Sequence, residues 1–317
     1  MTASPVAAAV DAAAAVLGER ARRDVPLGPF TTYRVGGPAA LLLRVEDEDD
    51  LERARQAVAA SGIDVLVVGR GSNLLVADSG FPGLVLTLGE AFATVDVDGT
   101  VVRAGGAVTL PVLARRTAAA GLTGLEWAVG VPGSVGGGVR MNAGGHGSEI
   151  RETLRTARLF DVAGAAPGPT DVAAADLALG YRRSAVAPTQ VVVAAEFALE
   201  TGDRAAAEAE LAAIVRWRRE NQPGGANAGS VFTNPPADSA GRLIEAAGCK
   251  GRRRGSAFVS PKHANFFQVD DQGRASDVLD LMDEVRGAVH QAFGVLLETE
   301  VRLIGFPQPS SSSGGSP

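Results

Sequence analysis

Apolar and polar residues follow one another along the first 90 residues in patterns typical of strands and helices in turn. The alanine-rich residues 6–17 predict a surface helix, and residues 41–45 predict a buried strand behind a Gly-Gly-Pro turn. Residues 47–60 carry acidic side chains in their first turn, where the helix dipole favours them, and so predict a second helix. A strand over residues 63–68 is followed by the strand pair LLVA and LVLTL, on either side of DSGFPG. We therefore expect an α/β unit over residues 1–90.

The pattern changes in residues 91–202. Short strands, ATVDV and TVVRAG, flank an Asp98-Gly99 turn, which is a strong hairpin signal. A helix is predicted over residues 110–120, and more strands are predicted over residues 154–161 and 191–200. We expect these residues to form a second, α+β unit.

A third unit is expected over residues 203–305. It opens with an Ala- and Glu-rich helix over residues 203–220 and contains an amphipathic helix over residues 275–293. The alternation in LLETEVRLIG predicts a strand that returns at the end of the unit. Residues 306–317 are rich in Ser, Gly and Pro and predict a disordered tail.

Composition excludes several classes of protein. The chain has 317 residues, a formal charge of −6 and 46% hydrophobic residues, which is a core-forming composition without the basic balance of a nucleic-acid-binding protein. A single cysteine excludes an internal disulfide and fits a reducing compartment. The three histidines lack metal-ligand spacing, and no apolar run approaches the roughly 20 residues of a membrane helix. We expect a cytoplasmic protein without a metal, a nucleic-acid partner, a signal peptide or membrane insertion.

The stretch WAVGVPGSVGGGVRMNAGGHG, residues 127–147, is too rich in glycine to predict a helix or an ordinary strand. Glycine permits positive φ or a close approach of the backbone, whereas a flexible linker would be polar. Two interpretations stay open. Ordered backbone N–H groups here bind a flat or polyanionic ligand, or the stretch is a set of tight turns in a β-rich domain.

The turn GRGSN, residues 69–73, follows a predicted strand, where phosphate-binding turns are often found. It is not the dinucleotide fingerprint, because Leu74 replaces the third glycine and a strand follows; a P-loop motif is also absent from the sequence. The turn is therefore either a ligand-binding turn or a hairpin turn with Asn at a left-handed position.

Four further motifs have both a structural and a chemical interpretation. GYRRS, residues 180–184, is either a solvated turn or a bidentate grip on a carboxylate. Ser230 is a turn residue without the surroundings of a hydrolase nucleophile. Glu298 and Glu300 share one face of the last strand, where a buried carboxylate must be paired or used. Residues 250–254 hold four cations, which form a solvated surface or receive a diphosphate.

Taken together and in this order, these segments resemble the UDP-N-acetylenolpyruvoylglucosamine reductase family. The resemblance spans nearly the whole chain, apart from the N-terminal helix and the tail. The matching stretches are TTYRVGGPA (31–39), VVGRGSNLLVAD (67–78), GLTGLEWAVGVPGSVGGGVRMNAGGHG (121–147), GYRRS (180–184), NAGSVFTNP (227–235), GRLIEAAGCKG (241–251), SPKHANFF (260–267) and LETEVRLIG (297–305).

The resemblance implies an α+β fold. Residues 1–90 and 91–202 would form a two-part FAD-binding region of the vanillyl-alcohol-oxidase type, and residues 203–305 a smaller α+β substrate-binding domain. It also implies reduction of the enolpyruvyl ether of UDP-N-acetylglucosamine to UDP-N-acetylmuramate in peptidoglycan precursor synthesis. NADPH would be the co-substrate, FAD would be bound non-covalently, and the protein would be a monomer.

Position by position, the resemblance implies that Arg182 and Glu300 stabilise an enolate-like intermediate and that Ser230 supplies a proton. Substrate contacts are implied for Tyr181, Asn234 and His263. Cofactor contacts are implied for Tyr33, Val68, Gly69, Arg70, Gly71, Ser72, Asn73, Gly130, Pro132, Gly133, Ser134, Gly136, Gly137, Asn142 and Gly144.

The chain departs from the family pattern at three places. Arg70 stands where glycine is usual, and Val186 replaces a common aromatic residue. The segment between Arg182 and Ser230 lacks the tyrosine-bearing loop of one branch of the family, so another group must cover the substrate diphosphate. Our hypothesis is that Lys250 and residues 252–254 do so.

The sequence is also compatible with two other functions. One is a sugar-alcohol oxidase of the same flavin superfamily, for which His146 would be a candidate for covalent flavin attachment. The other is a flavin-binding protein without turnover.

Overall fold

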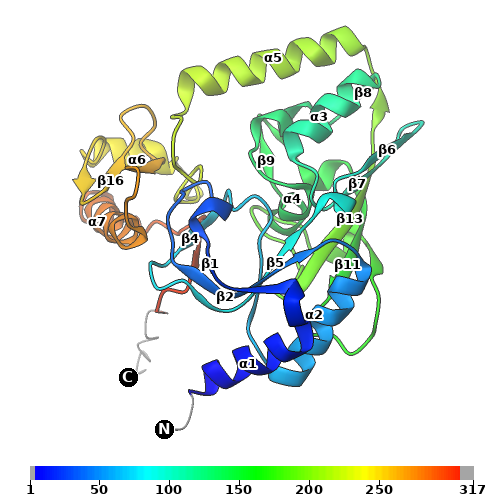
Figure 1. Ribbon diagram of the computed structural model, residues 1–317. Coiled ribbons are helices and arrows are strands. Elements are labelled where there is room, and N and C mark those ends of the chain that lie inside the picture. Colours follow the sequence, from blue (N-terminus) through cyan, green and yellow to red (C-terminus); the bar gives the residue numbers. More distant parts are fainter. Residues whose placement is uncertain (1–3, 308–317) are drawn as a thin grey trace, which may run out of the picture.

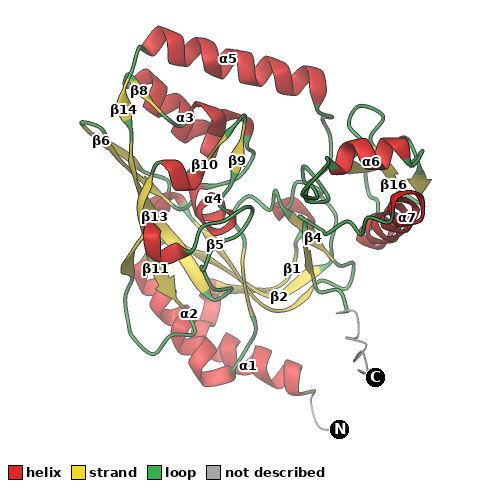
Figure 2. Cartoon of the chain, turned by 180° about the vertical axis from the view of Figure 1, so that it is seen from behind, coloured by secondary structure: helices red, strands yellow, loops and turns green. Residues whose placement is uncertain are grey.

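The computed structural model describes residues 4–307. In the N-terminal part, two helices cover one face of a mixed four-stranded sheet (Figures 1 and 2). Strand β1 is antiparallel to β2, whereas β2, β5 and β3 run parallel in that order. The elements of this part are α1 (Pro5–Leu17), β1 (Ala21–Pro26), β2 (Pro38–Val45), α2 (Glu48–Ser61), β3 (Val65–Val67), β4 (Leu74–Val76) and β5 (Phe81–Leu88).

Both faces of this first sheet are buried. Leu41 and Leu43 of β2 pack with Leu51 under the two helices, while Leu42 points to the opposite face and packs with Val85. A sheet that is covered on both sides needs apolar residues in succession, which explains the run of leucines that predicted this strand.

The second part is built on a five-stranded antiparallel sheet of order β12-β11-β13-β7-β6. Its core also takes in α3, α4 and one face of α5. The elements are β6 (Val95–Asp98), β7 (Val101–Gly105), α3 (Leu110–Ala119), β8 (Leu122–Thr123), α4 (Val135–Met141), β9 (Gly144–Gly145), β10 (Ser148–Glu149), β11 (Leu154–Asp161), β12 (Thr170–Ala173), β13 (Gln190–Ala198), β14 (Glu200–Thr201) and α5 (Arg204–Asn221).

The third part contains α6, α7 and a small antiparallel sheet of order β15-β16-β17 (Figure 1, left). Its core also includes Tyr33, Val35 and Leu75 from the first part, so the two parts share apolar packing. The elements are α6 (Ala240–Ala246), β15 (Arg253–Arg254), β16 (Ala257–Val259), β17 (Phe267–Val269), α7 (Ala275–Phe293) and β18 (Arg302–Ile304). Six 3₁₀ turns complete the described chain: Gly18–Arg20, Gly28–Phe30, Glu90–Phe92, Glu126–Gly130, Ile150–Glu152 and Ala174–Leu177.

The chain end returns to the first part, where β18 pairs in parallel with β4. Regular pairing covers only residues 302–304 and not the whole LLETEVRLIG stretch. Before it, Thr299 makes a single bridge to Phe232. Because residues 298–300 are outside a regular ladder, Glu298 is exposed and Glu300 is half-buried instead of sharing one environment.

The prediction that the glycine-rich stretch contains no helix is wrong. Residues 135–141 form α4, and the Ser134 hydroxyl caps its first turn by accepting the N–H of Gly137. A Cβ added to Gly136 would lie 3.2 Å from the carbonyl oxygen of Val192, so glycine lets this helix approach β13 closely. Tertiary packing therefore outweighs the low helix propensity of glycine.

The unit boundaries at residues 90, 202 and 305 stay predictions. Helix α5 was assigned to the third unit, but Ala207, Leu211 and Ile214 place its apolar face in the core of the second part. No helix between residues 4 and 307 is long and apolar enough to cross a membrane. Most of the predicted disordered tail, residues 308–317, lies outside the described residues.

Candidate active site

A cavity of about 1250 Å³ lies where the three parts meet. Its walls come from the turn 69–73, the glycine-rich stretch 130–146, the end of α5, the turn 227–230 and the returning segment 299–304. Several of the segments that the sequence singled out separately therefore share one cavity.

The GRGSN turn connects β3 to β4 and is held by the chain end. The Asn73 side-chain amide donates to the carbonyl oxygen of Glu300 at 3.1 Å, and the N–H of Arg302 donates to the carbonyl oxygen of Asn73 at 3.0 Å. Gly71 has a φ of +57°, and a Cβ there would lie 2.1 Å from the carbonyl oxygen of Phe30, so only glycine fits. Within residues 4–307, the backbone N–H groups of residues 69–73 donate no hydrogen bond.

The glycine-rich stretch lies directly against this turn. A Cβ added to Gly69 would lie 2.4 Å from the hydroxyl oxygen of Ser134. The N–H groups of Gly133 and Ser134 also lack an acceptor among the described residues. Two loops in contact thus present unpaired backbone donors to one cavity, and such a donor set fits the diphosphate of a dinucleotide such as FAD.

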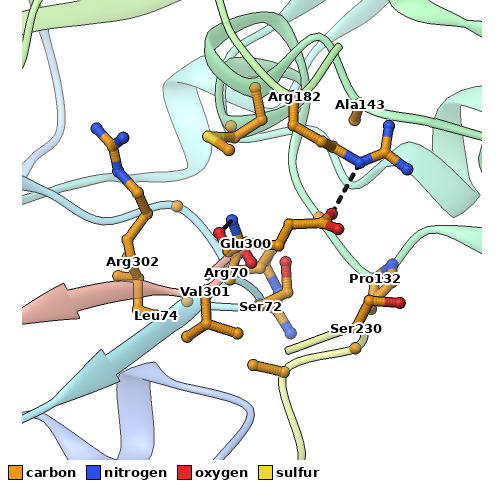
Figure 3. Close-up of a pocket in the computed structure, with 18 of the residues that line it drawn as sticks. Arg70, Ser72, Leu74, Pro132, Ala143, Arg182, Ser230, Glu300, Val301 and Arg302 are labelled. Atoms are coloured by element: carbon orange, nitrogen blue, oxygen red, sulfur yellow. Dashed lines mark hydrogen bonds and ion pairs between the residues drawn. The ribbon is translucent and has the colours of Figure 1, made fainter. Parts of the chain in front are cut away.

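Arg182 reaches the cavity from a tight turn. Gly180 and Arg183 exchange two backbone hydrogen bonds, and this places Arg182 at a φ of +55°. Its Nε donates to Oε1 of Glu300 at 2.7 Å (Figure 3), and its Nη2 donates to the carbonyl oxygen of Gly144 at 3.2 Å. The side chains of Arg182 and Glu300 are 24% and 14% exposed, so this ion pair is largely shielded from water.

The Glu300 carboxyl is in an environment that favours its protonated form. Burial raises the pKa of Glu300 above its ordinary value, while the charge and hydrogen bond of Arg182 oppose that rise. The backbone N–H of Glu300 donates to the carbonyl oxygen of Val231 at 2.8 Å, which fixes the position of the carboxyl. The site therefore holds a fixed cation beside a carboxyl whose pKa burial raises.

Ser230 lines the same cavity, and its hydroxyl has no hydrogen-bond partner among the described residues. The next two residues are held by Asn265, which is 2% exposed. The Asn265 amide donates to the carbonyl oxygen of Phe232 at 2.8 Å, its Oδ1 accepts the N–H of Phe232 at 3.0 Å, and its backbone carbonyl accepts the N–H of Val231 at 2.8 Å. Asn265 positions the serine; the sequence contained it in SPKHANFF without indicating a role.

Most of the predicted cofactor and catalytic residues line the cavity, but four of the predicted cofactor residues do not. Tyr33 is wholly buried in the core of the third part, and that burial raises the pKa of its hydroxyl. Val68 is buried under the first sheet, and Gly136 packs on β13. The residues that line the cavity are Gly69, Arg70, Gly71, Ser72, Asn73, Gly130, Pro132, Gly133, Ser134, Gly137, Gly144, Arg182, Ser230 and Glu300.

Asn142, the fourth residue outside the cavity, connects two walls of the site. Its amide donates to the carbonyl oxygen of Gly180 at 3.0 Å and to Oε2 of Glu149 at 3.0 Å. Its Oδ1 accepts the N–H of Arg151 at 3.0 Å. Asn142 therefore ties the glycine-rich stretch to the turn that carries Arg182.

The three predicted substrate residues also lie outside the cavity lining. Tyr181 is 54% exposed, and its ring packs against the Arg182 guanidinium at 4.9 Å. Oδ1 of Asn234 accepts the N–H of Ala240 at 3.0 Å, at the start of α6. Nδ1 of His263 accepts the N–H of Asn265 at 3.2 Å, and burial lowers the pKa of His263.

The hypothesis that the basic segment 250–254 covers a substrate diphosphate stays a prediction, and the positions of its cations do not favour it. Its four cations are outside the cavity, and three of them pair with acidic side chains: Lys250 with Glu245 at 2.9 Å, Arg253 with Asp270 at 2.5 Å, and Arg254 with Asp280 and Glu284 at 3.5 Å. Lys250, Arg253 and Arg254 are exposed at the surface.

Arg218 is one of four cavity-lining arginines that the sequence did not single out, with Arg140, Arg286 and Arg302. It lines the cavity from the last turn of α5, and burial lowers its pKa. Within residues 4–307 it has no acidic partner within 4.0 Å. Its segment, RWRREN, has the composition of an ordinary basic helix end, so no local signal distinguished it.

Comparisons with known proteins agree with this geometry. Residues 39–165 match a family described as an FAD binding domain, and residues 221–304 match the C-terminal domain of UDP-N-acetylenolpyruvoylglucosamine reductase. UDP-N-acetylenolpyruvoylglucosamine reductase 2 of Symbiobacterium thermophilum is 44% identical over 292 residues, which are 90% of this chain and 92% of that protein. The reductase of Acidiphilium cryptum is 42% identical over 308 residues, or 97% of this chain and 98% of that protein.

The crystal structure of the reductase from Thermus caldophilus superposes with a TM-score of 0.79 at 36% identity, covering 90% of this chain and 99% of that one. The expected combination of an FAD-binding region with a smaller C-terminal domain in a mixed helix-and-sheet fold is confirmed. The chain therefore belongs to the UDP-N-acetylenolpyruvoylglucosamine reductase family of FAD-binding oxidoreductases.

Proposed function

We propose that this protein uses NADPH and non-covalently bound FAD to reduce the enolpyruvyl ether of UDP-N-acetylglucosamine to UDP-N-acetylmuramate, in cytoplasmic peptidoglycan precursor synthesis. One observation supports this most strongly. Arg182, Glu300 and Ser230 come from three distant segments and line the same cavity as the two loops with unpaired amides. FAD, when bound, supplies the hydride chemistry, and the protein supplies placement and electrostatics.

The two loops are suited to hold the FAD diphosphate. Their unpaired N–H groups, in residues 69–73 and 133–134, donate to anionic oxygens without a competing acceptor nearby. Arg70 also lines the cavity and adds a positive charge. The glycines keep side chains out of the space between this backbone and the ligand.

Arg182 and Glu300 are suited to stabilise charge on the substrate. Adding hydride to the terminal methylene carbon of the enolpyruvyl group pushes an electron pair towards its carboxylate. Arg182 neutralises that growing negative charge, and Glu300, whose carboxyl pKa is raised by burial, shares a proton with it. Both groups are held before the reaction, so little reorganisation is needed.

Ser230 is suited to deliver the proton that completes the reduction. Its hydroxyl lines the cavity without a hydrogen-bond partner among the described residues, and Asn265 fixes the backbone just after it. A serine hydroxyl is a weak acid, but an enolate-like carbon is basic enough to take its proton.

The test is to follow flavin colour without oxygen. NADPH should bleach the wild-type protein, and the enolpyruvyl substrate should then restore the colour. Ser230→Ala should bleach at the normal rate but recover about 10²–10⁴ times more slowly. Ser79→Ala, an exposed serine away from the cavity, should behave like the wild type.

Two outcomes would contradict the proposal. If wild-type protein bleaches with NADPH but never recovers with the substrate, the substrate is wrong. If Ser230→Ala recovers at the wild-type rate, Ser230 is not the proton donor.

A further inference from the structure

The C-terminal end of α5 forms a wall of the cavity that the proposed chemistry does not use. Trp217, Arg218 and Gln222 line the cavity there, together with His146 of the glycine-rich stretch. We call these four residues the α5 rim. Figure 1 shows α5 running above the second part towards α6, so the rim lies where the chain passes to the third part.

Trp217 is exposed where a large apolar side chain is unusual. The apolar residues earlier in α5, such as Leu211 and Ile214, face the core, whereas Trp217 is 46% exposed. The other tryptophan of the chain, Trp127, is only 3% exposed and belongs to the core. An indole ring left open inside a ligand cavity offers a flat surface on which another flat ring can stack.

His146 holds the indole of Trp217 from the side. The two ring centroids are 5.1 Å apart and the rings are nearly perpendicular, at 84°. His146 and Gly147 have φ values of +53° and +88° and form the two-residue turn of the hairpin β9–β10. Positive φ at both positions is what a type I′ hairpin turn requires, so the hairpin fixes His146 and His146 in turn restrains Trp217.

The polar groups of the α5 rim lack partners. Arg218 is half-buried and has no acidic partner within 4.0 Å among the described residues. Oε1 of Gln222 is buried, and no donor within residues 4–307 reaches it. Buried polar groups normally have a partner, so the rim needs an anion for Arg218 and an N–H or O–H donor for Gln222.

We propose that Trp217, restrained by His146, is the platform on which the base of a nucleoside diphosphate stacks, while Arg218 binds its diphosphate and Gln222 accepts from the base or the ribose. The planar base would stack on the open face of Trp217. The diphosphate would be the anion that Arg218 lacks, and an N–H or hydroxyl group would be the donor that Gln222 lacks. This inference rests on the proposed function, in which the UDP-sugar and NADPH both carry a base next to a diphosphate.

The experiment measures binding of UDP and, separately, of NADP⁺ to the FAD-loaded protein by calorimetry. Trp217→Ala should weaken the binding of one of these ligands about 10-fold, which is within the range for loss of base stacking on an aromatic side chain. Trp217→Phe should restore most of the affinity, because it keeps a ring. Arg216→Ala, an exposed neighbour outside the cavity, is the matched control and should bind both ligands as the wild type does.

Two further readouts separate stacking from a structural effect. Ligand binding should quench the tryptophan fluorescence of the wild type, and this change should disappear in Trp217→Phe, which retains only Trp127. In turnover, Trp217→Ala should raise KM about 10-fold for the ligand affected and leave kcat within about twofold, because a stacking contact far from the reacting atoms contributes to binding.

A loss for UDP alone identifies the base as uracil, and a loss for NADP⁺ alone identifies a base of the pyridine nucleotide; both results support the inference. Unchanged affinity for both ligands in Trp217→Ala would overturn it. If UDP or NADP⁺ binding weakens in a protein that fails to reduce the enolpyruvyl substrate, the proposed function fails while base stacking stands. If turnover is normal and neither affinity changes, the stacking inference alone fails.

Discussion

The two sides of the cavity are built from different parts of the chain and present different chemistry. The proposed cofactor side consists of backbone in the turn 69–73 and the glycine-rich stretch. Glycine is required at Gly69 and Gly71, because a Cβ there would lie 2.4 Å from the Ser134 hydroxyl oxygen and 2.1 Å from the carbonyl oxygen of Phe30. The substrate side consists of side chains, among them Arg182, Ser230 and Glu300, which come from positions far apart in the sequence. Substitutions on the first side should change the affinity for FAD, whereas substitutions on the second should change the rate at which the substrate is reduced.

Arg182→Ala should have the largest effect of the substitutions considered below. It removes the cation beside Glu300 and should slow flavin recovery with the enolpyruvyl substrate about 10²–10³-fold, the usual cost of removing one group that stabilises transition-state charge. Bleaching by NADPH should be unchanged. Stopped-flow absorbance measures both steps, and Arg183→Ala, next in sequence and outside the cavity, is the control. An equal slowing of both steps would show that Arg182 supports the fold and not the second half-reaction.

Gly71→Ala tests the cofactor side. The new Cβ would approach the carbonyl oxygen of Phe30 at a φ of +57°, and backbone strain of about 1–3 kcal/mol corresponds to a loss of roughly 5–150-fold in FAD affinity. Flavin release during gel filtration would reveal the loss.

Gly99→Ala is a matched control for this variant. Gly99 has nearly the same φ, +58°, but nothing lies within 4 Å of the added Cβ. It should keep its flavin even if its stability falls. Equal flavin loss in both variants would show that conformational strain, and not the shape of the FAD turn, explains the effect.

If the UDP-sugar is the ligand of the α5 rim, Arg218→Ala should raise its KM about 10-fold, because a charge-assisted hydrogen bond is worth roughly 1.5–3 kcal/mol. Arg254→Ala should change KM by less than about twofold, since its partners are Asp280 and Glu284 outside the cavity. Steady-state kinetics at fixed NADPH measure both variants. A larger effect at Arg254 than at Arg218 would restore the basic segment as the diphosphate site.

The smallest expected effect concerns stability and pH. Because burial raises the pKa of Glu300, the folded chain holds a proton at this carboxyl over a pH window in which the unfolded chain has lost it. Stability therefore falls as the pH rises from the ordinary value of 4.5 through the raised value.

Glu300→Gln carries no such proton. The difference in Tm, wild type minus Glu300→Gln, should decrease as the pH rises from about 4 to about 8 in thermal melts. Glu298→Gln, two residues away and exposed, should give a difference that does not follow this trend. A Tm difference for Glu300→Gln that increased with pH would mean that Arg182 dominates over burial.

The regular elements were predictable because their signals are local. The leucines of β2, the acidic first turn of α2 and the Asp98-Gly99 turn each predict structure from neighbouring residues, and the structure contains all three. Local patterns did not predict the helix in the glycine-rich stretch. Its helix α4 is stabilised by the Ser134 cap and by close packing on β13, and composition alone does not reveal the second.

The site residues also divide into those that sequence motifs indicated and those whose role depends on tertiary contacts. The resemblance pointed to Arg182, Ser230 and Glu300 one by one, and the structure brings them to one cavity. It also shows that Asn142 and Asn265 act by holding backbone, and that Tyr33 is part of a core. Burial and hydrogen-bond partners separate a ligand contact from a structural contact, and neither can be read from residue type.

The sequence by itself determined the family and most of the helices and strands, because the motifs and patterns that indicate them depend on residues close to one another in the chain. Only the tertiary structure decided which cations face the ligands. Lys250, Arg253 and Arg254 looked suitable but are paired with acidic side chains, whereas Arg218 looked ordinary and faces the cavity without an acidic partner among the described residues. A charged side chain acts on a ligand only if the fold turns it to the cavity and leaves it without a competing partner, and both conditions depend on segments that are distant in sequence.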